Sequence, residues 1–530
     1  MFSTILIISA AIIHVCYGQV SPCSKTNRAS DLDACLNEIR TIAQNDDWFW
    51  YGRSYFTLCP EEKRQEIGCL NNDADPNRLS LADKMFTKGT FDPMALDRYI
   101  DAAYVSPPGQ YMGCDHLYVT ENTTSFEIDP ILNTTHNPWS LRILPDMSWT
   151  SNADDYFTLL VIDTSNGIRH GIFINIKESN MSTAEVIKKY HGPMNPTSKE
   201  NVYAFILLKQ NAGNMSLGPG WAEKIAASMI PMNISNFITE HGLQGPIALN
   251  WMKARNDPYS VTGAFYIENC VPFIQERAIA QNRPFLKPDM SLDVRVDISF
   301  TSEPIAFTSC CNDYNYPLRS FKLDPIGDGI TNAAEVRTGG SSRTYDLKMR
   351  KLGPNPSDFI GIHYSLVMID PDVPAAQVGN KSHPLLHMIV MNIPMGNVSN
   401  GEVMVSYNGP MPPDQLPHTY YYLLYKQQGA LNTSIWGSYA GNCPERLAGR
   451  CLWDIERFVT ENSLMLSGAT WMRTFNDAYV NHTKIVAGGD EDEFCVNSPN
   501  YPCPTSGTAF LGNSLELLFS VIFLFSIYIQ

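Results

Sequence analysis

The sequence predicts a mainly β protein of the α+β class, with two tandem β-sheet domains, peripheral helices and a small helical, cysteine-containing module in front of them. Three observations lead to this prediction. The chain has 530 residues, which is too long for a single core. A long segment of it occurs twice. Both copies consist of short apolar runs rich in branched residues and separated by turn residues, which favours strands over helices.

The internal repeat defines the domains. A shift of 217 residues places residues 170–210 on residues 387–427 without a gap, and seventeen of forty-one positions are identical. Residues 157–163 resemble residues 364–370 at a shift of 207, so the first copy lacks ten residues in the following loop. Each copy has the size of one domain. We place the first copy at residues 95–275 and the second at residues 283–490.

Strands are expected within both copies. Apolar residues alternate with polar ones over 292–299, which predicts a half-buried strand, and the apolar runs 157–162 and 386–393 are typical of inner strands. Helices are expected only at 222–229 and 454–461. The N-terminal module at residues 19–94 differs, because its apolar residues between Leu32 and Ile42 recur at helical spacing, with Ser30 placed as an N-cap.

Both ends of the chain carry an apolar segment. Residues 1–18 read as a signal peptide, although they contain no Lys or Arg, and an N-terminal anchor is the alternative. The tail 517–530 is short for a spanning helix, which needs about 20 residues. Together with the small residues and the spacer upstream, in a stalk and attachment region at 491–516, it fits the signal for a GPI (glycolipid) anchor. A short spanning helix and a secreted tail remain alternatives.

The cysteines indicate export to an oxidising compartment. Twelve of the thirteen remain once the signal peptide is removed. Cys443 with Cys451 and Cys495 with Cys503 are expected as local pairs. The four cysteines of the N-terminal module, Cys23, Cys35, Cys59 and Cys69, allow three connectivities. The partners of Cys114, Cys270, Cys310 and Cys311 stay open.

Glycosylation is also expected, because the chain carries nine Asn-x-Ser/Thr sequons. They lie at Asn122, Asn133, Asn180, Asn214, Asn233, Asn380, Asn397, Asn432 and Asn481.

Charge and motifs exclude several functions. The net charge of −16 without a basic cluster argues against nucleic acid as a partner. We find no catalytic signature, no metal-ligand spacing and no cofactor-binding loop, so the sequence predicts a protein that is not an enzyme and has no metal or cofactor.

The second copy concentrates the residues that can carry binding chemistry. A predicted strand ends in Asp370-Pro371-Asp372-Val373-Pro374, His387 opens the next strand, and Gly409-Pro410 precedes His418-Thr419-Tyr420. A buried carboxylate beside an imidazole stabilises its protonated form. Imidazole and phenol groups can then donate charge-assisted hydrogen bonds to a small anion.

These ordered motifs resemble the signature of the phosphatidylethanolamine-binding protein family, as does Gly218-Pro219-Gly220-Trp221 in the first copy. The resemblance spans residues 95–490. It implies a cavity at the sheet edge that takes a phosphate or a phospholipid head group. By this resemblance Asp370, Asp372, His387 and His418 form the ligand-binding pocket, with Pro410 and Tyr420 as its walls.

Both copies depart from the family pattern. The family's Gly-x-His-Arg is Leu416-Pro417-His418-Thr419 in the second copy, so a positive group that orders the Asp-Pro-Asp loop is absent. In the first copy His170 survives, but Asn201 stands at the position of His418 and Thr164 follows Asp163. The first copy is therefore read as a degenerate domain that kept its core and lost its ligand.

The functional hypothesis is a secreted or surface-anchored glycoprotein that binds a small anion or phospholipid head group through its second domain. Two alternatives are a protease inhibitor or signalling regulator that acts by contact with a protein partner, and a structural surface glycoprotein with a vestigial pocket.

Overall fold

The computed structural model describes residues 20–45 and 96–503, apart from internal gaps at 133, 165–167, 196–199, 212, 227–232, 265–269, 288–291, 338–343, 352–360, 375–377 and 395. The predicted signal peptide, the predicted C-terminal tail, most of the predicted N-terminal module and Asn133 therefore lie outside the described residues. The chain divides into two compact units. The first runs to Arg295 and includes Arg350–Ile360, and the second comprises the chain from Val296 onward without that segment.

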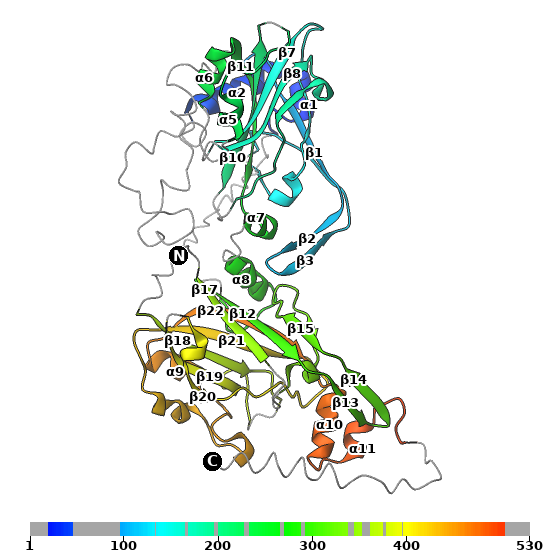
Figure 1. Cartoon of the computed structure of the whole chain (residues 1–530), viewed down its shortest axis with the longest axis vertical. Helices are drawn as coiled ribbons and strands as arrows, with labels where there is room; N and C mark the ends of the chain where they lie inside the picture. Colours follow the sequence, from blue (N-terminus) through cyan, green and yellow to red (C-terminus); the bar gives the residue numbers. More distant parts are fainter. Residues whose placement is uncertain are drawn as a thin grey trace, which may run out of the picture. The chain divides into compact units, whose positions relative to one another are not determined.

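Each unit contains one large β-sheet (Figure 1). Both sheets have six strands, and the strand order is the same in the two. In the first unit the order is β5-β11-β10-β7-β8-β9, and in the second it is β16-β22-β21-β18-β19-β20. One edge pair in each sheet is parallel, and the printed neighbours otherwise run antiparallel. The first sheet comprises β5 (Thr135–His136), β7 (Tyr156–Asp163), β8 (Ile168–Lys177), β9 (Glu185–Lys188), β10 (Asn201–Gln210) and β11 (Leu243–Ala254). The second comprises β16 (Ile330–Thr331), β18 (His363–Asp370), β19 (Leu385–Pro394), β20 (Glu402–Val405), β21 (His418–Gln427) and β22 (Met465–Thr474).

The smaller sheets are also duplicated. Each unit has a three-stranded sheet, β4-β1-β6 or β15-β12-β17, and a hairpin, β2-β3 or β13-β14. In the first unit these strands are β1 (Asp101–Ser106), β2 (Gly109–Gly113), β3 (His116–Thr120), β4 (Thr124–Glu127) and β6 (Asp146–Ser148). In the second they are β12 (Val294–Ser302), β13 (Ile305–Ser309), β14 (Asn312–Tyr316), β15 (Arg319–Lys322) and β17 (Thr344–Lys351). The predicted fold of two tandem β domains is confirmed, since the repeat in sequence corresponds to a repeat of complete topology.

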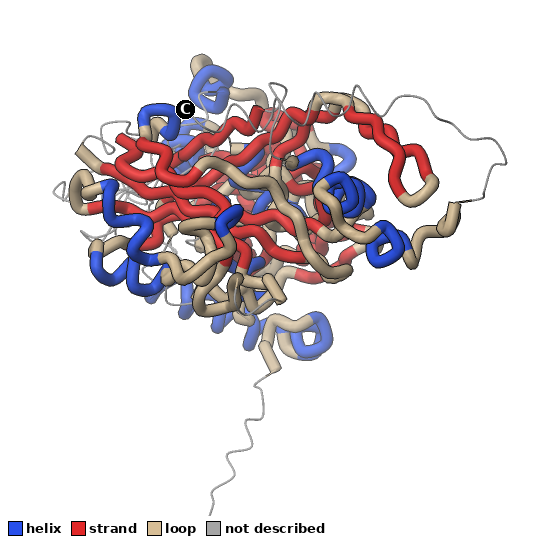
Figure 2. The backbone as a smooth tube through the Cα atoms, turned by 90° about the horizontal axis from the view of Figure 1, so that it is seen from below, coloured by secondary structure: helices blue, strands red, loops and turns tan. Residues whose placement is uncertain are grey.

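The helices are short and peripheral, and strands dominate the regular structure (Figure 2). They are α1 (Lys25–Ser30), α2 (Leu32–Asn45), α5 (Trp221–Ala226), α6 (Ile234–Glu240), α7 (Pro258–Gly263), α8 (Val271–Ala280), α9 (Ile455–Glu461), α10 (Ala478–Val486) and α11 (Glu491–Cys495). The helix expected at 454–461 begins one residue later, because Asp454 is its N-cap and accepts a hydrogen bond from the Arg457 amide. Of the helix expected at 222–229, α5 covers residues up to Ala226.

Both faces of the large sheet in the first unit are covered. One face packs against α2, α5 and α6, and the other packs against the β4-β1-β6 sheet (Figure 1). Strands buried on both faces have no polar side, which explains the continuous apolar runs that marked them in the sequence. The apolar face of α2, with Cys35, Ile39 and Ala43, belongs to this core. The described part of the N-terminal module is thus packed onto the first β domain.

The cap assigned to α2 from the sequence was wrong. Ser30 is the last residue of α1, and its hydroxyl donates to the Asn27 carbonyl. The carboxylate of Asp31 accepts the Ala34 amide at 2.9 Å instead and caps α2. Aspartate and serine are about equally good N-caps, so composition alone did not separate two adjacent candidates.

Five disulfides lie within the described residues, and one of the two expected local pairs was wrong. Cys443–Cys451 is present, as is Cys23–Cys35. Cys495 pairs with Cys310, and Cys503 pairs with Cys311, across sequence separations of 185 and 192 residues. Cys114 pairs with Cys270. The two long-range bridges fasten α11 and the residues up to Cys503 to the β13-β14 hairpin of the second domain.

A buried polar network explains why several residues are identical in the two copies of the repeat. In the second domain Asn392 has a positive φ of 53°, and its side chain bonds Glu402, Gln427 and the backbone of Leu431 at 2.7 to 3.0 Å. Asn175 forms the same network in the first domain with its own Glu185 and Gln210. Asparagine tolerates the left-handed region better than most residues. Each Asn can therefore adopt the positive φ that its strand requires and also form the hydrogen bonds of the network.

Asn392→Ala is expected to destabilise the second domain by roughly 2–4 kcal/mol, because it leaves several buried polar partners unsatisfied and places alanine at a positive φ. Urea unfolding combined with hydrogen exchange of each domain measures this effect. Asn175→Ala is the matched control and should open the first domain instead. A loss of less than about 0.5 kcal/mol would show that the network is not structural.

Within the described residues, no helix combines the length and the apolar character needed to cross a membrane.

Candidate functional site

Strand order brings the predicted pocket residues to one end of the large sheet in the second domain. β18 lies between β19 and β21, and both of its pairings are antiparallel. The end of β18 at Asp370 therefore meets the starts of β19 and β21, which carry His387 and His418. Asp370, His387 and His418 are 2%, 3% and 1% exposed, so the site is closed to bulk water in this structure.

A buried carboxylate–imidazole pair forms the centre of the site. His418 Nδ1 lies 2.8 Å from Asp370 Oδ2, and both side chains are almost fully buried. Burial by itself lowers the pKa of His418. The hydrogen bond and charge of Asp370, followed by the charges of Asp414 and Asp372, outweigh burial and raise the pKa of His418 above its usual value. His418 is therefore biased toward the imidazolium, with Nδ1–H donating to Asp370 and Nε2–H left for another acceptor.

His387 has the opposite character. Its Nδ1 donates to the Asn408 backbone carbonyl at 2.8 Å, which leaves Nε2 as the unprotonated nitrogen. Nε2 is buried and has no hydrogen-bond partner among the residues that the structure describes. Burial lowers the pKa of His387, and the nearby charge of Asp370 only partly opposes this shift. The site thus offers a cationic donor at His418 and a neutral acceptor at His387.

The Asp-Pro-Asp loop is ordered without the arginine of the family pattern. Asp370 Oδ1 accepts the Asp372 amide at 2.9 Å, and Asp372 Oδ2 accepts the Thr419 amide at 2.8 Å. The backbone N–H at position 419 thus supplies a donor to this loop, at the position where the family pattern has the arginine.

Tyr420, one of the two residues predicted as walls, contacts His387 and Asp370. Tyr420 is 1% exposed, and its ring packs edge-on against His387 with centroids 5.0 Å apart. Burial, then the charge of Asp370 and a hydrogen bond to it, raise the pKa of Tyr420 well above its usual value. The Tyr420 hydroxyl thus already donates a hydrogen bond to Asp370. Pro410 is buried in the loop that follows β20.

Asp414 is a member of the site that the sequence interpretation missed. Its Oδ1 lies 3.3 Å from His418 Nε2, an ion-pair distance, although the alignment is not that of a good hydrogen bond. The same oxygen accepts the Leu416 amide at 2.9 Å. Its side chain is 34% exposed, whereas His418 is 1% exposed. An aspartate four residues before His418 was the available signal, but a Pro-Pro-Asp loop reads first as a turn.

The equivalent position of the first domain has lost its charge pair. Asp163 accepts a hydrogen bond from the Asn201 side chain at 2.8 Å, where the second domain has Asp370 and His418. His170 donates to the His191 carbonyl at 2.7 Å, as His387 does to Asn408. Burial lowers the pKa of His170 to about 4, so this imidazole stays neutral. The first domain keeps the framework of the site without its cation, which agrees with its interpretation as degenerate.

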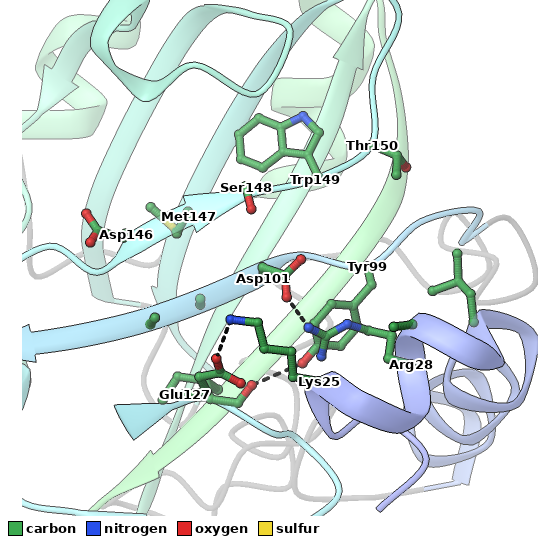
Figure 3. A pocket seen from close by; sticks show the side chains of 15 residues that line it. Lys25, Arg28, Tyr99, Asp101, Glu127, Asp146, Met147, Ser148, Trp149 and Thr150 are labelled. Atoms are coloured by element: carbon green, nitrogen blue, oxygen red, sulfur yellow. Dashed lines mark hydrogen bonds and ion pairs between the residues drawn. The ribbon is translucent and has the colours of Figure 1, made fainter. Parts of the chain in front are cut away.

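The first domain has a separate cavity of about 670 Å³ between α1 and the β4-β1-β6 sheet (Figure 3). Arg28 pairs with Asp101 and lies over the Tyr99 ring, and Lys25 pairs with Glu127 at 3.0 Å. These charges neutralise one another across the groove. The cavity contains none of the predicted pocket residues.

The chain therefore contains two copies of one β-sheet domain, the second of which holds a buried aspartate–histidine pair. Residues 333–472 match the family model described as phosphatidylethanolamine-binding protein. The second domain of the chain belongs to that family.

The chain is similar to several known proteins. An uncharacterized protein of Caenorhabditis elegans is 21% identical over 93% of this chain and 95% of its own length. A 26 kDa secreted antigen of Toxocara canis is 34% identical over 14% of this chain and 28% of its own length. The structure of a phosphatidylethanolamine-binding protein from Plasmodium vivax aligns with 38% of this chain and 97% of that chain, at 18% identity and a TM-score of 0.26.

The five disulfides indicate an extracellular protein, because such bridges persist in oxidising compartments. The eight sequons within the described residues are all at least partly exposed. Among the described residues no cluster of three or more His, Cys, Asp or Glu side chains is arranged to hold a metal ion.

Proposed function

We propose that the second domain binds a small phosphate-like anion, free or as a phospholipid head group, on a secreted or surface-anchored glycoprotein. The observation that carries the proposal is the buried Asp370–His418 pair. A protonated imidazole held by a carboxylate presents its second N–H as a charge-assisted donor in a dry environment, where such a bond is strongest.

The two imidazoles together favour a particular protonation state of the ligand. His418 donates through Nε2–H and requires an anionic oxygen. His387 Nε2 accepts and requires a hydroxyl or an N–H. A phosphate monoester in its singly protonated form carries both an anionic oxygen and a P–OH group, so it can satisfy both nitrogens. A sulfate monoester lacks the proton and would leave His387 unsatisfied.

His387→Ala/His418→Ala is expected to abolish the thermal protection that inorganic phosphate or phosphorylethanolamine gives to the second domain. A ligand at a hundred times its Kd stabilises the folded state by about 2.7 kcal/mol, which is a rise of several degrees in Tm. Differential scanning calorimetry with increasing ligand measures it. His170→Ala is the control and should leave the protection unchanged. Equal protection of the double variant would show that the anion binds elsewhere.

A parallel titration with a sulfate monoester tests the protonation argument. Weaker protection by sulfate than by phosphate at pH 6 is expected. Equal protection would mean that His387 does not accept from the ligand.

A further inference from the structure

The pocket groups are closed to solvent on every side that the structure describes, so a ligand enters only if some covering group moves. Asp370, His387, His418 and Tyr420 are all at most 3% exposed. The covering group in direct contact with His418 Nε2 is the partly exposed Asp414 carboxylate. That nitrogen is also where the bound anion of the proposed function would be held.

We propose that Asp414 is a displaceable internal anion, whose carboxylate occupies the ligand's place on His418 and must leave before an external anion binds. The proposal rests on the proposed function, because it concerns the same imidazole. It makes Asp414 a specificity-determining residue. A ligand must outcompete a tethered carboxylate, so weakly basic or poorly hydrogen-bonding anions are excluded.

The structure also provides a place for the displaced carboxylate. Asp414 lines a cavity of about 580 Å³ formed by the β13-β14 hairpin, the start of α10 and the α11 region. Lys484 on α10 donates to the Pro413 carbonyl at 3.2 Å, one residue before Asp414. Burial lowers the pKa of Lys484, and the charges of Glu493 and Asp414 oppose that shift, so the ammonium and the Asp414 carboxylate already attract each other. Asp414 can therefore exchange one cationic partner, His418, for another, Lys484.

The loop that carries Asp414 suits such an exchange. Pro412 and Pro413 stiffen its first half, while Asp414, Gln415 and Leu416 are each partly or fully exposed. The contact with His418 spans 3.3 Å without good alignment, and the Leu416 amide shares the same oxygen. Rotation of one side chain toward the cavity would release His418 without breaking the Asp370 pair.

The test compares inorganic phosphate and phosphorylethanolamine binding to the full chain by isothermal titration calorimetry. Asp414→Asn should bind either ligand at least about tenfold more tightly than the natural protein, the effect of removing one competing charged acceptor. Glu456→Gln removes one exposed carboxylate from α9 of the same domain and is the matched control. It should change affinity less than about twofold, because exposed charges are screened by solvent and salt.

The outcomes separate this proposal from the proposed function. Unchanged or weaker binding by Asp414→Asn would overturn the proposal that the Asp414 carboxylate competes with the ligand for His418. Weaker binding would make Asp414 part of the ligand site. Binding by the variant alone would support both proposals. Absence of binding in both proteins would overturn the proposed function and the competition together. An NMR titration that then still showed a lower His418 pKa in the variant would confirm the Asp414 contact as purely structural.

Lys484→Met tests the exchange step. It should weaken binding in the natural protein and have little effect when combined with Asp414→Asn, because Lys484 acts through the displaced carboxylate. An equal loss in both backgrounds would show that Lys484 attracts the ligand directly, and would overturn the exchange.

Discussion

Asp370→Asn is expected to abolish anion binding and to destabilise the second domain by about 3–5 kcal/mol, the usual effect of removing one partner from a buried charge pair. The carboxylate accepts from His418 Nδ1 and from the Asp372 amide, and its charge contributes to the raised pKa of His418. An asparagine has the same shape but no charge. Burial of His418 would then act with less opposition and favour the neutral ring, which offers no charge-assisted donor.

The pH dependence of stability gives a second readout of this variant. Because the folded-state pKa of His418 is raised, the unfolded state releases its proton first, at about pH 6.5. The stabilisation from the pair is therefore fully present below about pH 6.5 and is lost as pH rises through the folded pKa of His418. Asp370→Asn should flatten this part of the stability profile. NMR titration of His418 and urea unfolding between pH 5 and 9 measure both effects.

Asp163→Asn is the matched control for Asp370→Asn, since Asp163 holds the same position in the first domain and its partner is the uncharged Asn201. It should leave anion binding and the His418 titration unchanged. A variant Asp370→Asn that still bound phosphate with the natural affinity would contradict the assignment of the pair as the anion site.

The sequence predicted those parts of the structure in which the same residue stands at the equivalent position of both copies. The Tyr of Tyr-x-Gly-Pro-Met-x-Pro, the Asn of each irregular strand and the Gln that closes each segment recur because each makes a buried hydrogen bond in both domains. When the same structural role is filled by the same residue type in both domains, the role can be recognised from the repeat in the sequence. The two tandem β domains and the loss of the charge pair from the first could therefore be predicted.

The parts that could not be predicted depend on contacts between distant segments with no repeated counterpart. The bridges Cys310–Cys495 and Cys311–Cys503 join residues that sequence spacing alone would never pair. Loop-closure entropy favours near neighbours, and here the fold overrides it by presenting the β13-β14 hairpin to α11. Asp414 also lacks a repeated counterpart, since the equivalent position of the first domain at a shift of 217 is Thr197.

The first domain should lose stability in acid because of His170, by about 3 kcal/mol between pH 6.5 and pH 4. Its buried imidazole has a pKa of about 4, so below the unfolded-state pKa the unfolded chain binds a proton that the folded domain excludes. The contribution has the opposite sign to that of His418. The stability change can be followed by urea unfolding at several pH values, with hydrogen exchange of β8 and β10 to assign it to this domain.

His170→Asn isolates the effect, because an asparagine amide can replace Nδ1–H as the donor to the His191 carbonyl but does not titrate. Its unfolding free energy should be lower than that of the natural protein at pH 8 and should fall less between pH 6.5 and pH 4. The same substitution at His191, whose side chain is exposed, is the control and should leave the slope unchanged. An identical acid slope in His170→Asn would show that His170 is not the source of the loss of stability in acid.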